Sequence, residues 1–350
     1  MISVKKRSLQ NAVKPGLFFV FSTYALLSLH ANEIRYGRKE PIQRPAKAIR
    51  LASYNVLNLF DAKDDPMLQG EFDDITMVTS ENRCECLGKV IKELDADILC
   101  LQEVESEEAL RWFRDAYLAD MSYDYLVSHD VGYYRGIEQS VLSRFPISNP
   151  TIWKNEDLTD MEDLKTGEGW NEDGELPTQF QRSPLMVDID IKAEEYADNY
   201  EMTVVVVHHK SGWHRRQRES EALQLVELLQ TRLEKEPDLN LLVVGDFNAG
   251  PFDKSLAVYQ EAGFINAYNH RWKTTGNTRD YFRTHESNRV LDYMMIHPNA
   301  DAEIVDHSFQ IVGTLFPGDD YDWRKDEPPS GYAADHYPLV IDMMPQDVSQ

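Results

Sequence analysis

A carboxylate and a carboxamide two residues apart, Asp246 and Asn248, follow the apolar run Leu241 to Val244. The run fits a strand covered on both faces, and because side chains alternate along a strand, Asp246 and Asn248 point the same way from its end. That pair suits a metal-bound phosphate. The same residue types also favour ordinary turns, so this segment alone does not establish a site.

Polar side chains follow other apolar runs of the chain in the same manner. Each run is typical of a buried strand, and its end carries an amide, an acid or an imidazole. These segments are Leu51 to Asn55, Ile98 to Glu103, Val204 to His208, Val290 to Asp292, and ADHYPLV with Asp335 and His336. If the strand ends meet, they form one acidic pocket with two imidazoles.

The predicted pocket has the groups needed to bind Mg²⁺. Hard cations prefer oxygen ligands, and Mg²⁺ takes one or two carboxylates while keeping waters and substrate phosphate for its other positions. Glu103 is the leading candidate ligand, and Asn55 at a neighbouring strand end is placed to orient Glu103 or to complete the metal shell. Glu105, Glu107 and Glu108 are expected at the solvated start of a helix.

Histidines are candidates for the proton transfers and phosphate contacts of phosphodiester hydrolysis. His336, next to Asp335, offers a base or a phosphate-contacting imidazole, and a carboxylate such as Asp292 on its other nitrogen would fix its tautomer. Of His208 and His209, only one can face the pocket, because neighbours on a strand face opposite ways. Five more histidines are expected to take no part: His129, His270, His285, His297 and His307.

The densest basic cluster after the N-terminal segment follows these histidines and consists of Lys210, Arg215, Arg216 and Arg218. We interpret it as the solvated start of a helix. The alternative is that the cluster offsets the repulsion between an acidic protein and an anionic substrate.

Helical spacing of apolar residues connects the predicted strands. It predicts one helix over Glu81 to Leu94 and another over Arg215 to Leu233, each joining two strands. Residues 32–48 are polar and are predicted to form a linker. Because the candidate residues are spread along the rest of the chain, residues 49–345 are predicted to be a single catalytic domain with two stacked sheets and outer helices.

The N-terminus is typical of an export signal. Basic residues precede the apolar run Leu17 to Leu29, which is short for a membrane span and is followed by the small residue Ala31. Residues 1–31 are therefore predicted to be a signal peptide, so that the mature protein is periplasmic or secreted. An uncleaved membrane anchor is the alternative.

Charge and cysteine content limit the partners. Cleavage after residue 31 removes four positive charges and takes the formal net charge from −24 to −28. Such a chain repels polyanions at long range, which argues against tight binding of duplex DNA but not against a nuclease whose metal ions supply positive charge locally. Cys84, Cys86 and Cys100 are expected as free thiols, although a link from Cys100 to either of the others is left open.

Seven segments in a fixed order resemble the endonuclease/exonuclease/phosphatase superfamily, and most of all its bacterial exported branch. They are SYNVLNLFD, LCLQEVE, RGIEQSVLS, VVHHKSGW, VVGDFNAGPFD, RVLDYMMI and ADHYPLVI, within about Arg50 to Asp342. The resemblance implies an α/β fold, a four-layered sandwich of two mostly antiparallel sheets flanked by helices. It also implies a metal-dependent phosphoesterase that uses Mg²⁺ or Mn²⁺.

The resemblance further implies roles for the residues that match its motifs. Glu103 would bind the metal, with Asn55 beside it and Asp335 assisting. Asp246 would orient or deprotonate the attacking water, and Asn248 would hold the phosphate.

Further positions follow from the same motifs. His336 paired with Asp292 would contact the phosphate or act as a base, and His208 matches the family's His-x-Lys-Ser segment, which leaves His209 as the outward neighbour. Glu138 stands where the exported branch usually has Asp. Arg182 is either a phosphate clamp or an ordinary surface arginine.

The expected function is therefore that of an exported metal-dependent phosphodiester hydrolase, taken first to be an endonuclease or other nuclease. The alternative is a phosphatase or sphingomyelinase-like phosphodiesterase that acts on a small or lipid-linked phosphate, which the acidic composition favours. A non-catalytic binding domain is disfavoured because each inspected position holds a chemically competent residue. Nucleic acid or another phosphodiester is the expected partner, and no stable membrane partner is predicted.

Overall fold

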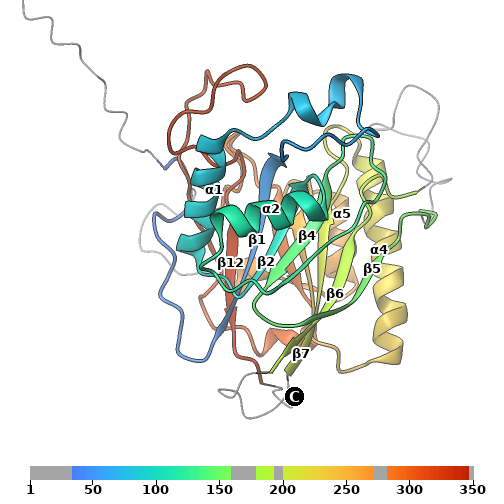
Figure 1. Cartoon of the computed structure of the whole chain (residues 1–350). Coiled ribbons are helices and arrows are strands. Elements are labelled where there is room, and N and C mark those ends of the chain that lie inside the picture. Colours follow the sequence, from blue (N-terminus) through green and yellow to red (C-terminus); the bar gives the residue numbers. More distant parts are fainter. Residues whose placement is uncertain (1–33, 159–178, 193–199, 271–281, 347–350) are drawn as a thin grey trace, which may run out of the picture. The chain divides into compact units, whose positions relative to one another are not determined.

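A computed structural model of the chain describes residues 34–158, 179–192, 200–270 and 282–346. Its strands form two six-stranded sheets (Figure 1). Sheet 1 has the order β11 (Gln310–Ile311), β12 (Leu339–Met343), β1 (Ile49–Leu59), β2 (Ile98–Val104), β4 (Glu138–Ser143), β3 (Tyr125–Ser128). Sheet 2 has the order β5 (Ile147–Ile152), β6 (Leu185–Ile191), β7 (Tyr200–His208), β8 (Leu241–Asp246), β10 (Asp292–Ile296), β9 (Ile265–Asn266).

Each sheet has one parallel pair of strands, β1 with β2 in sheet 1 and β7 with β8 in sheet 2. The other neighbouring strands are antiparallel. The prediction of two mostly antiparallel sheets is confirmed.

The described residues form five helices, α1 (Glu81–Leu94), α2 (Glu107–Tyr117), α4 (Arg215–Lys235), α5 (Lys254–Glu261) and α6 (Pro298–Asp301), with 3₁₀ turns η1 (Gly70–Phe72), η2 (Asp74–Thr76) and η3 (Ala267–His270). Of these helices, α1 connects the parallel pair β1 and β2, and α4 connects the parallel pair β7 and β8. The side chains of Ser80 and Ser106 accept backbone N–H bonds at the starts of α1 and α2, as N-caps do. The predicted bounds of α1 are confirmed, and α4 continues two residues beyond its predicted end.

Three apolar clusters define four layers. One fills the space between the sheets, with Leu51 and Val141 from sheet 1 against Val204 and Val244 from sheet 2. The second joins the outer face of sheet 1 to α1 and α2, and the third joins the outer face of sheet 2 to α4 and α5 (Figure 1). Burial of these faces fixes which side chains of each strand point inward.

The inward-facing set continues at the strand ends as polar residues. Val204 and Val206 lie between the sheets while Val205 and Val207 face the helices, so alternation turns His208 inward and His209 outward. Asp246 follows the same rule after Val244. Polar side chains therefore collect at one end of the inter-sheet layer.

Glu103 reaches this end only because β2 is irregular. Cys100 faces inward and Leu101 outward, so strict alternation would turn Glu103 toward the helices. The pairing register of β2 with β4 shifts between Gln102 and Val104, and Glu103 has a φ of 68°. This bulge places the Glu103 carboxylate in the inter-sheet layer.

Other local expectations differ from the structure. Asp292 begins β10, whereas the prediction placed it at the end of a strand. Glu105 is buried and its carboxylate accepts the Asp61 N–H, so its expected place at a solvated helix start is wrong. His209 points away from the site as predicted but is buried, in contact with Glu221 and Tyr259.

The N-terminal segments are placed only in part. The predicted signal peptide 1–31 lies outside the described residues. In the described part of the predicted linker, Arg38 forms an isolated β-bridge with Val312. In the part of the chain that the structure describes, no helix is both long and apolar enough to cross a membrane.

Gly245 allows β7 and β8 to approach closely beside Asp246. Its φ is 140°, and a Cβ at this position would lie 2.0 Å from the Val207 carbonyl oxygen. Only a residue without a side chain fits such a contact. The backbone, and not only the side chains, therefore sets the position of Asp246.

We expect Gly245→Ala to lower the free energy of unfolding by more than about 2 kcal/mol, because the added methyl group separates the two strands. Gly250→Ala is the matched control, since a Cβ there has no neighbour within 4 Å. Urea denaturation of both variants measures the difference. Equal stability of Gly245→Ala and the parent protein would contradict the close approach.

Candidate active site

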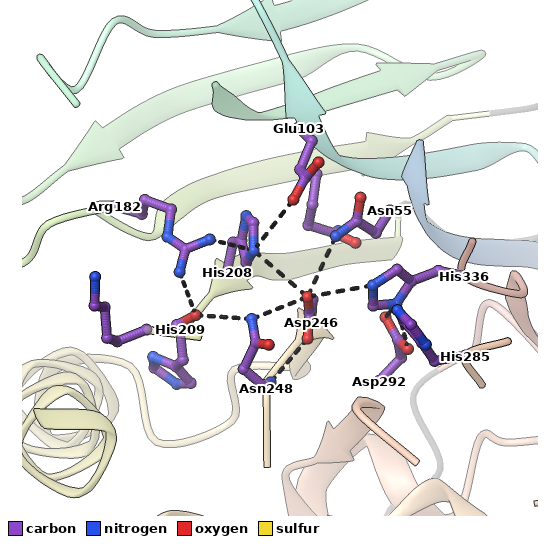
Figure 2. A network of polar contacts seen from close by, with 12 residues as sticks. Asn55, Glu103, Arg182, His208, His209, Asp246, Asn248, His285, Asp292 and His336 are labelled. Atoms are coloured by element: carbon purple, nitrogen blue, oxygen red, sulfur yellow. Dashed lines mark hydrogen bonds and ion pairs between the residues drawn. The ribbon is translucent and has the colours of Figure 1, made fainter. Parts of the chain in front are cut away.

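Asp246 lies at the centre of the polar strand ends (Figure 2). Its carboxylate is buried and accepts hydrogen bonds from Asn55 Nδ2 at 3.2 Å, Asn248 Nδ2 at 3.0 Å and the Asn248 N–H at 2.8 Å. The Nε2 atoms of His208 and His336 lie 3.4 Å and 3.7 Å from its Oδ2. Burial raises the pKa of Asp246, which the charge of His336 opposes and that of Asp292 reinforces.

The amides beside Asp246 are already engaged. Both hydrogens of Asn248 Nδ2 are used, one by Asp246 and one by the His209 carbonyl at 3.0 Å. To hold a phosphate, Asn248 must release one of these bonds. Asn55 orients Asp246 and not Glu103, while its Oδ1 accepts the Leu57 N–H.

His336 and Asp292 form the pair that the sequence predicts. His336 Nδ1 donates to the Asp292 carboxylate, at 2.8 Å and 3.0 Å from its two oxygens, and both side chains are buried. Burial opposes a charge on His336, but the carboxylates of Asp292 and Asp246 raise its pKa well above the usual value. His336 is therefore an imidazolium at neutral pH when no metal is bound, which suits contact with a phosphate oxygen better than proton abstraction.

His208 has the opposite charge state. Burial, and then the charge of Arg182, lower the pKa of His208 well below its usual value. Arg182 Nη1 donates to His208 Nε2, so the proton of the neutral ring is on Nδ1, which is buried without a hydrogen-bond partner. Arg182 also binds the His209 carbonyl at 2.9 Å, which makes it a buried part of the site and not a surface arginine.

Glu103 faces this pair from sheet 1 (Figure 2). Its Oε2 accepts the Asn58 N–H at 3.0 Å, and its Oε1 lies 3.7 Å from His208 Nε2, beyond hydrogen-bond distance. One carboxylate oxygen of Glu103 is thus fixed by the backbone, and the other is directed into the site.

Asp335, next to His336 in the chain, contacts His285. The sequence analysis expected His285 to take no part in the site. His285 Nδ1 accepts the Ser287 N–H, so its proton is on Nε2, 3.3 Å from Asp335 Oδ2. The His285 and His336 rings meet edge to face at 4.5 Å. Burial opposes ionisation of Asp335, yet the interactions with His285 and His336 lower its pKa to about 2. No apolar run marks His285, which precedes a turn and forms isolated β-bridges with Arg289 and His336.

Two carboxylate oxygens of the site are free to bind a divalent cation, although Glu103 is in neither group of ligand atoms that lie close to one another. Asp335 Oδ1 is buried without a hydrogen-bond partner, and Glu103 Oε1 is held by no donor among the described residues. Carboxylate oxygens of this kind are ligands for Mg²⁺ and Mn²⁺. His285, Asp335 and His336 also have ligand atoms within 4.8 Å of one another, as do Asp246, Asp292 and His336. The second group is better explained by the His336–Asp292 hydrogen bond, in which His336 Nδ1 and the Asp292 carboxylate already bind each other.

Glu138 stands apart from these contacts. It is buried in β4, and the hydrogen bond that the structure gives it is from the Val131 N–H at 3.2 Å. Burial raises its pKa to about 8. The structure therefore places Glu138 at a loop amide and not among the candidate ligands.

Comparisons with known proteins agree on the fold. The family model described as Endonuclease/Exonuclease/phosphatase family matches residues 52–309. Among solved structures, the chain is similar to the human Nocturnin catalytic domain with bound sulfate anion, at 19% identity and a TM-score of 0.50 over 86% of this chain and 95% of that one.

Two further structures are similar. An endonuclease/exonuclease/phosphatase from Bacteroides vulgatus has 15% identity and a TM-score of 0.52, over 85% of this chain and 99% of that one. Truncated Caenorhabditis elegans TDP2 has 13% identity and a TM-score of 0.50, over 85% of this chain and 97% of that one. No curated protein sequence matches the chain. At these identities the structural likeness shows the fold alone.

We expect Asp292→Asn to lower the pKa of His336, because the amide removes the nearest negative charge that stabilises the imidazolium. The measurement is a histidine NMR titration of the metal-free protein in EDTA, with His336→Gln used to assign the resonance. In the parent protein the His336 ring stays protonated as the pH rises past the value near 6.5 at which a free histidine loses its proton. An unchanged titration in Asp292→Asn would show that Asp292 does not set this charge.

Proposed function

The chain belongs to the endonuclease/exonuclease/phosphatase family of phosphoester hydrolases, and we propose that it hydrolyses phosphodiester bonds of nucleic acid with a bound divalent cation, Mg²⁺ or Mn²⁺. The observation that carries the proposal is the meeting of a buried carboxylate, Asp246, with the imidazolium of His336 at the end of the inter-sheet layer. This arrangement offers a proton acceptor and a positive charge to one phosphate.

The proposed roles follow from the contacts. Asp246 is held by three amide donors and orients or deprotonates the attacking water. Its raised pKa makes it a stronger base than an aspartate in water. His336, fixed by Asp292, contacts a phosphoryl oxygen and neutralises charge that develops there. Arg182 and neutral His208 lie on the other side of Asp246 and offer further contacts to the phosphate.

The cation would be held by Glu103 from sheet 1, with Asn55 beside it, and by Asp335 before β12. When bound, a divalent cation supplies Lewis-acid polarisation of the phosphate and lowers the pKa of a coordinated water. The backbone bond from Asn58 keeps Glu103 in place for this role, and the contact with His285 keeps Asp335 ionised.

Positive side chains near the site support an anionic substrate despite the acidic composition. A cavity of about 750 Å³ lies beside the end of β1, and Leu57 and Asn58 are among its lining residues. Four basic side chains contribute to that lining, against three acidic ones: Arg83, Arg135, Arg324 and Lys325. Arg135 also donates to Asn58 Oδ1 at 2.9 Å, and the backbone N–H of the same Asn58 binds Glu103. Lys325 is paired with Asp322 and Arg83 binds backbone carbonyls, which leaves Arg135 and Arg324 as the lining cations open to an anionic substrate.

We also propose that the protein is exported, on the basis of the N-terminal basic residues and the apolar run that follows them. Intact-mass analysis of the protein recovered from the export compartment is expected to show loss of residues 1–31. Recovery of the full-length chain from the membrane fraction would support the uncleaved anchor instead.

We expect residues 32–350 to cut plasmid DNA or RNA with Mg²⁺ or Mn²⁺ and not with EDTA. Asp246→Asn should lower the rate at least about 100-fold, because it removes the proton acceptor. Asp238→Asn, an exposed aspartate beyond the other end of β8, is the control. Bis-(p-nitrophenyl) phosphate and sphingomyelin are assayed in parallel. Turnover of only the small diester or the lipid would replace nucleic acid with the alternative substrate class.

A further inference from the structure

A second pocket lies where two loops leave sheet 2. Its volume is about 750 Å³, and we name it the Trp213–Phe252 pocket after the two aromatic residues that line it with Arg215, Arg216 and Lys254. The first loop joins β7 to α4 and begins at His208, and the second joins β8 to α5 and begins at Asp246. Trp213 is five residues from His208, and Phe252 is six residues from Asp246. The pocket is therefore built on the two strands that carry the candidate active site.

Both aromatic side chains are exposed. Trp213 is 81% exposed and Phe252 is 100% exposed, the highest values of any aromatic residue among those that the structure describes. Neither ring contributes to an apolar cluster of the core. Large rings left in water at one pocket indicate a surface that is covered by a ligand.

The charge of the pocket is positive. Two acidic residues line it, but Glu219 is paired with Arg216 at 3.4 Å and Asp253 with Arg218 at 3.1 Å. Arg215 and Lys254 have no ion pair among the described residues. They also stand in the first turns of α4 and α5, which contain no acidic residue, so each adds to the positive end of a helix dipole.

The two loops are held together by one buried side chain. Arg218 of α4 donates to the carbonyls of Lys210 at 3.0 Å and Gly212 at 2.8 Å in the first loop. Its other terminal nitrogen binds Asp253 at the end of the second loop. The pocket is thus preformed, and it keeps a fixed position relative to His208 and Asp246.

Aromatic faces beside unpaired cations are the combination that binds single-stranded nucleic acid: bases stack on the rings, and cations neutralise the phosphates. A duplex keeps its base faces stacked inside the helix and offers none to Trp213 or Phe252. A membrane surface is bound through an extended apolar face, whereas the large apolar side chains of this pocket are two rings set among charged residues. The volume lies within the range of about 300–1,000 Å³ that is typical of ligand pockets.

From these observations we infer that the Trp213–Phe252 pocket binds an unpaired nucleotide that flanks the bond to be cut in a single-stranded substrate. The inference rests on the proposed function for the chemistry, but binding at the pocket does not require turnover. It assigns a preference for single strands over duplexes to these two loops.

The first test is binding without turnover, measured by fluorescence polarisation of a labelled oligo(dT) with residues 32–350 in EDTA. We expect the double variant Trp213→Ala/Phe252→Ala to weaken binding about 10-fold or more, because both stacking surfaces are lost. Tyr125→Ala, an exposed ring on β3, is the matched control and should leave binding unchanged. Circular dichroism establishes that the variants are folded.

The charge of the pocket is tested by salt dependence. The double variant Arg215→Gln/Lys254→Gln is expected to reduce the slope of log affinity against log salt by about 1.4 on single strands, because each contact to a phosphate contributes about 0.7. An unchanged slope would show that Arg215 and Lys254 do not contact phosphates, which contradicts the inferred binding mode. Binding of anionic phospholipid vesicles that exceeds binding of oligo(dT), and that is lost in the aromatic variant, would overturn it in favour of a lipid surface.

Turnover separates this inference from the proposed function. We expect the aromatic double variant to raise KM for a single-stranded oligonucleotide and to leave kcat/KM for bis-(p-nitrophenyl) phosphate unchanged, since the small diester does not reach the pocket. If the parent protein cuts the oligonucleotide and the double variant binds and cuts it equally well, the pocket assignment fails and the nuclease assignment stands. If the parent protein binds oligo(dT) through the pocket but cuts no nucleic acid, the nuclease assignment fails.

Discussion

The buried carboxylate of Asp246 is the charge on which the arrangement of the candidate site depends. A buried anion is stable only when donors and opposite charges surround it. Asn55 and Asn248 supply the donors, and the imidazolium of His336 supplies the charge. His336 can carry that charge because Asp292 binds its other nitrogen. The three side chains therefore hold their charge states jointly, and residues from β1, β8, β10 and the segment before β12 must converge for any of them to be stable.

The apolar faces of the strands made much of this convergence predictable. Alternation along the valine run of β7 decides that His208 enters the inter-sheet layer and His209 leaves it, and the helical spacing in Glu81–Leu94 defines α1. These are local patterns, and hydrophobic burial enforces them over several residues at once. A shift of such a strand by one residue in register would turn its whole inward apolar face outward.

The parts that the sequence did not predict depend on single backbone irregularities and on contacts between distant segments. Glu103 enters the site through a bulge at a positive φ, and glutamate gives no sign of such a conformation. His285 contacts His336 through an isolated β-bridge and an edge-to-face ring contact, although the two residues are 51 positions apart in the chain. Asp292 stands at one end of a continuous apolar run, and such a run does not tell which end of the strand is at the site. Pattern analysis covers none of these, because each is fixed by tertiary packing.

The acidic composition and an anionic substrate are compatible because the two act over different distances. Repulsion between exposed charges is screened beyond about 10 Å at moderate salt. Arg182, His336 and the cations that line the two cavities would act only on a phosphate bound in contact with them. Affinity then depends on the fixed positions of a few cations, and those positions are set by the strands. Arg218 also fixes the two surface loops, since it binds both the loop that follows His208 and the loop that follows Asp246. A substrate seated against Trp213 and Phe252 would accordingly present its phosphodiester to Asp246 at a position fixed by the same two strands.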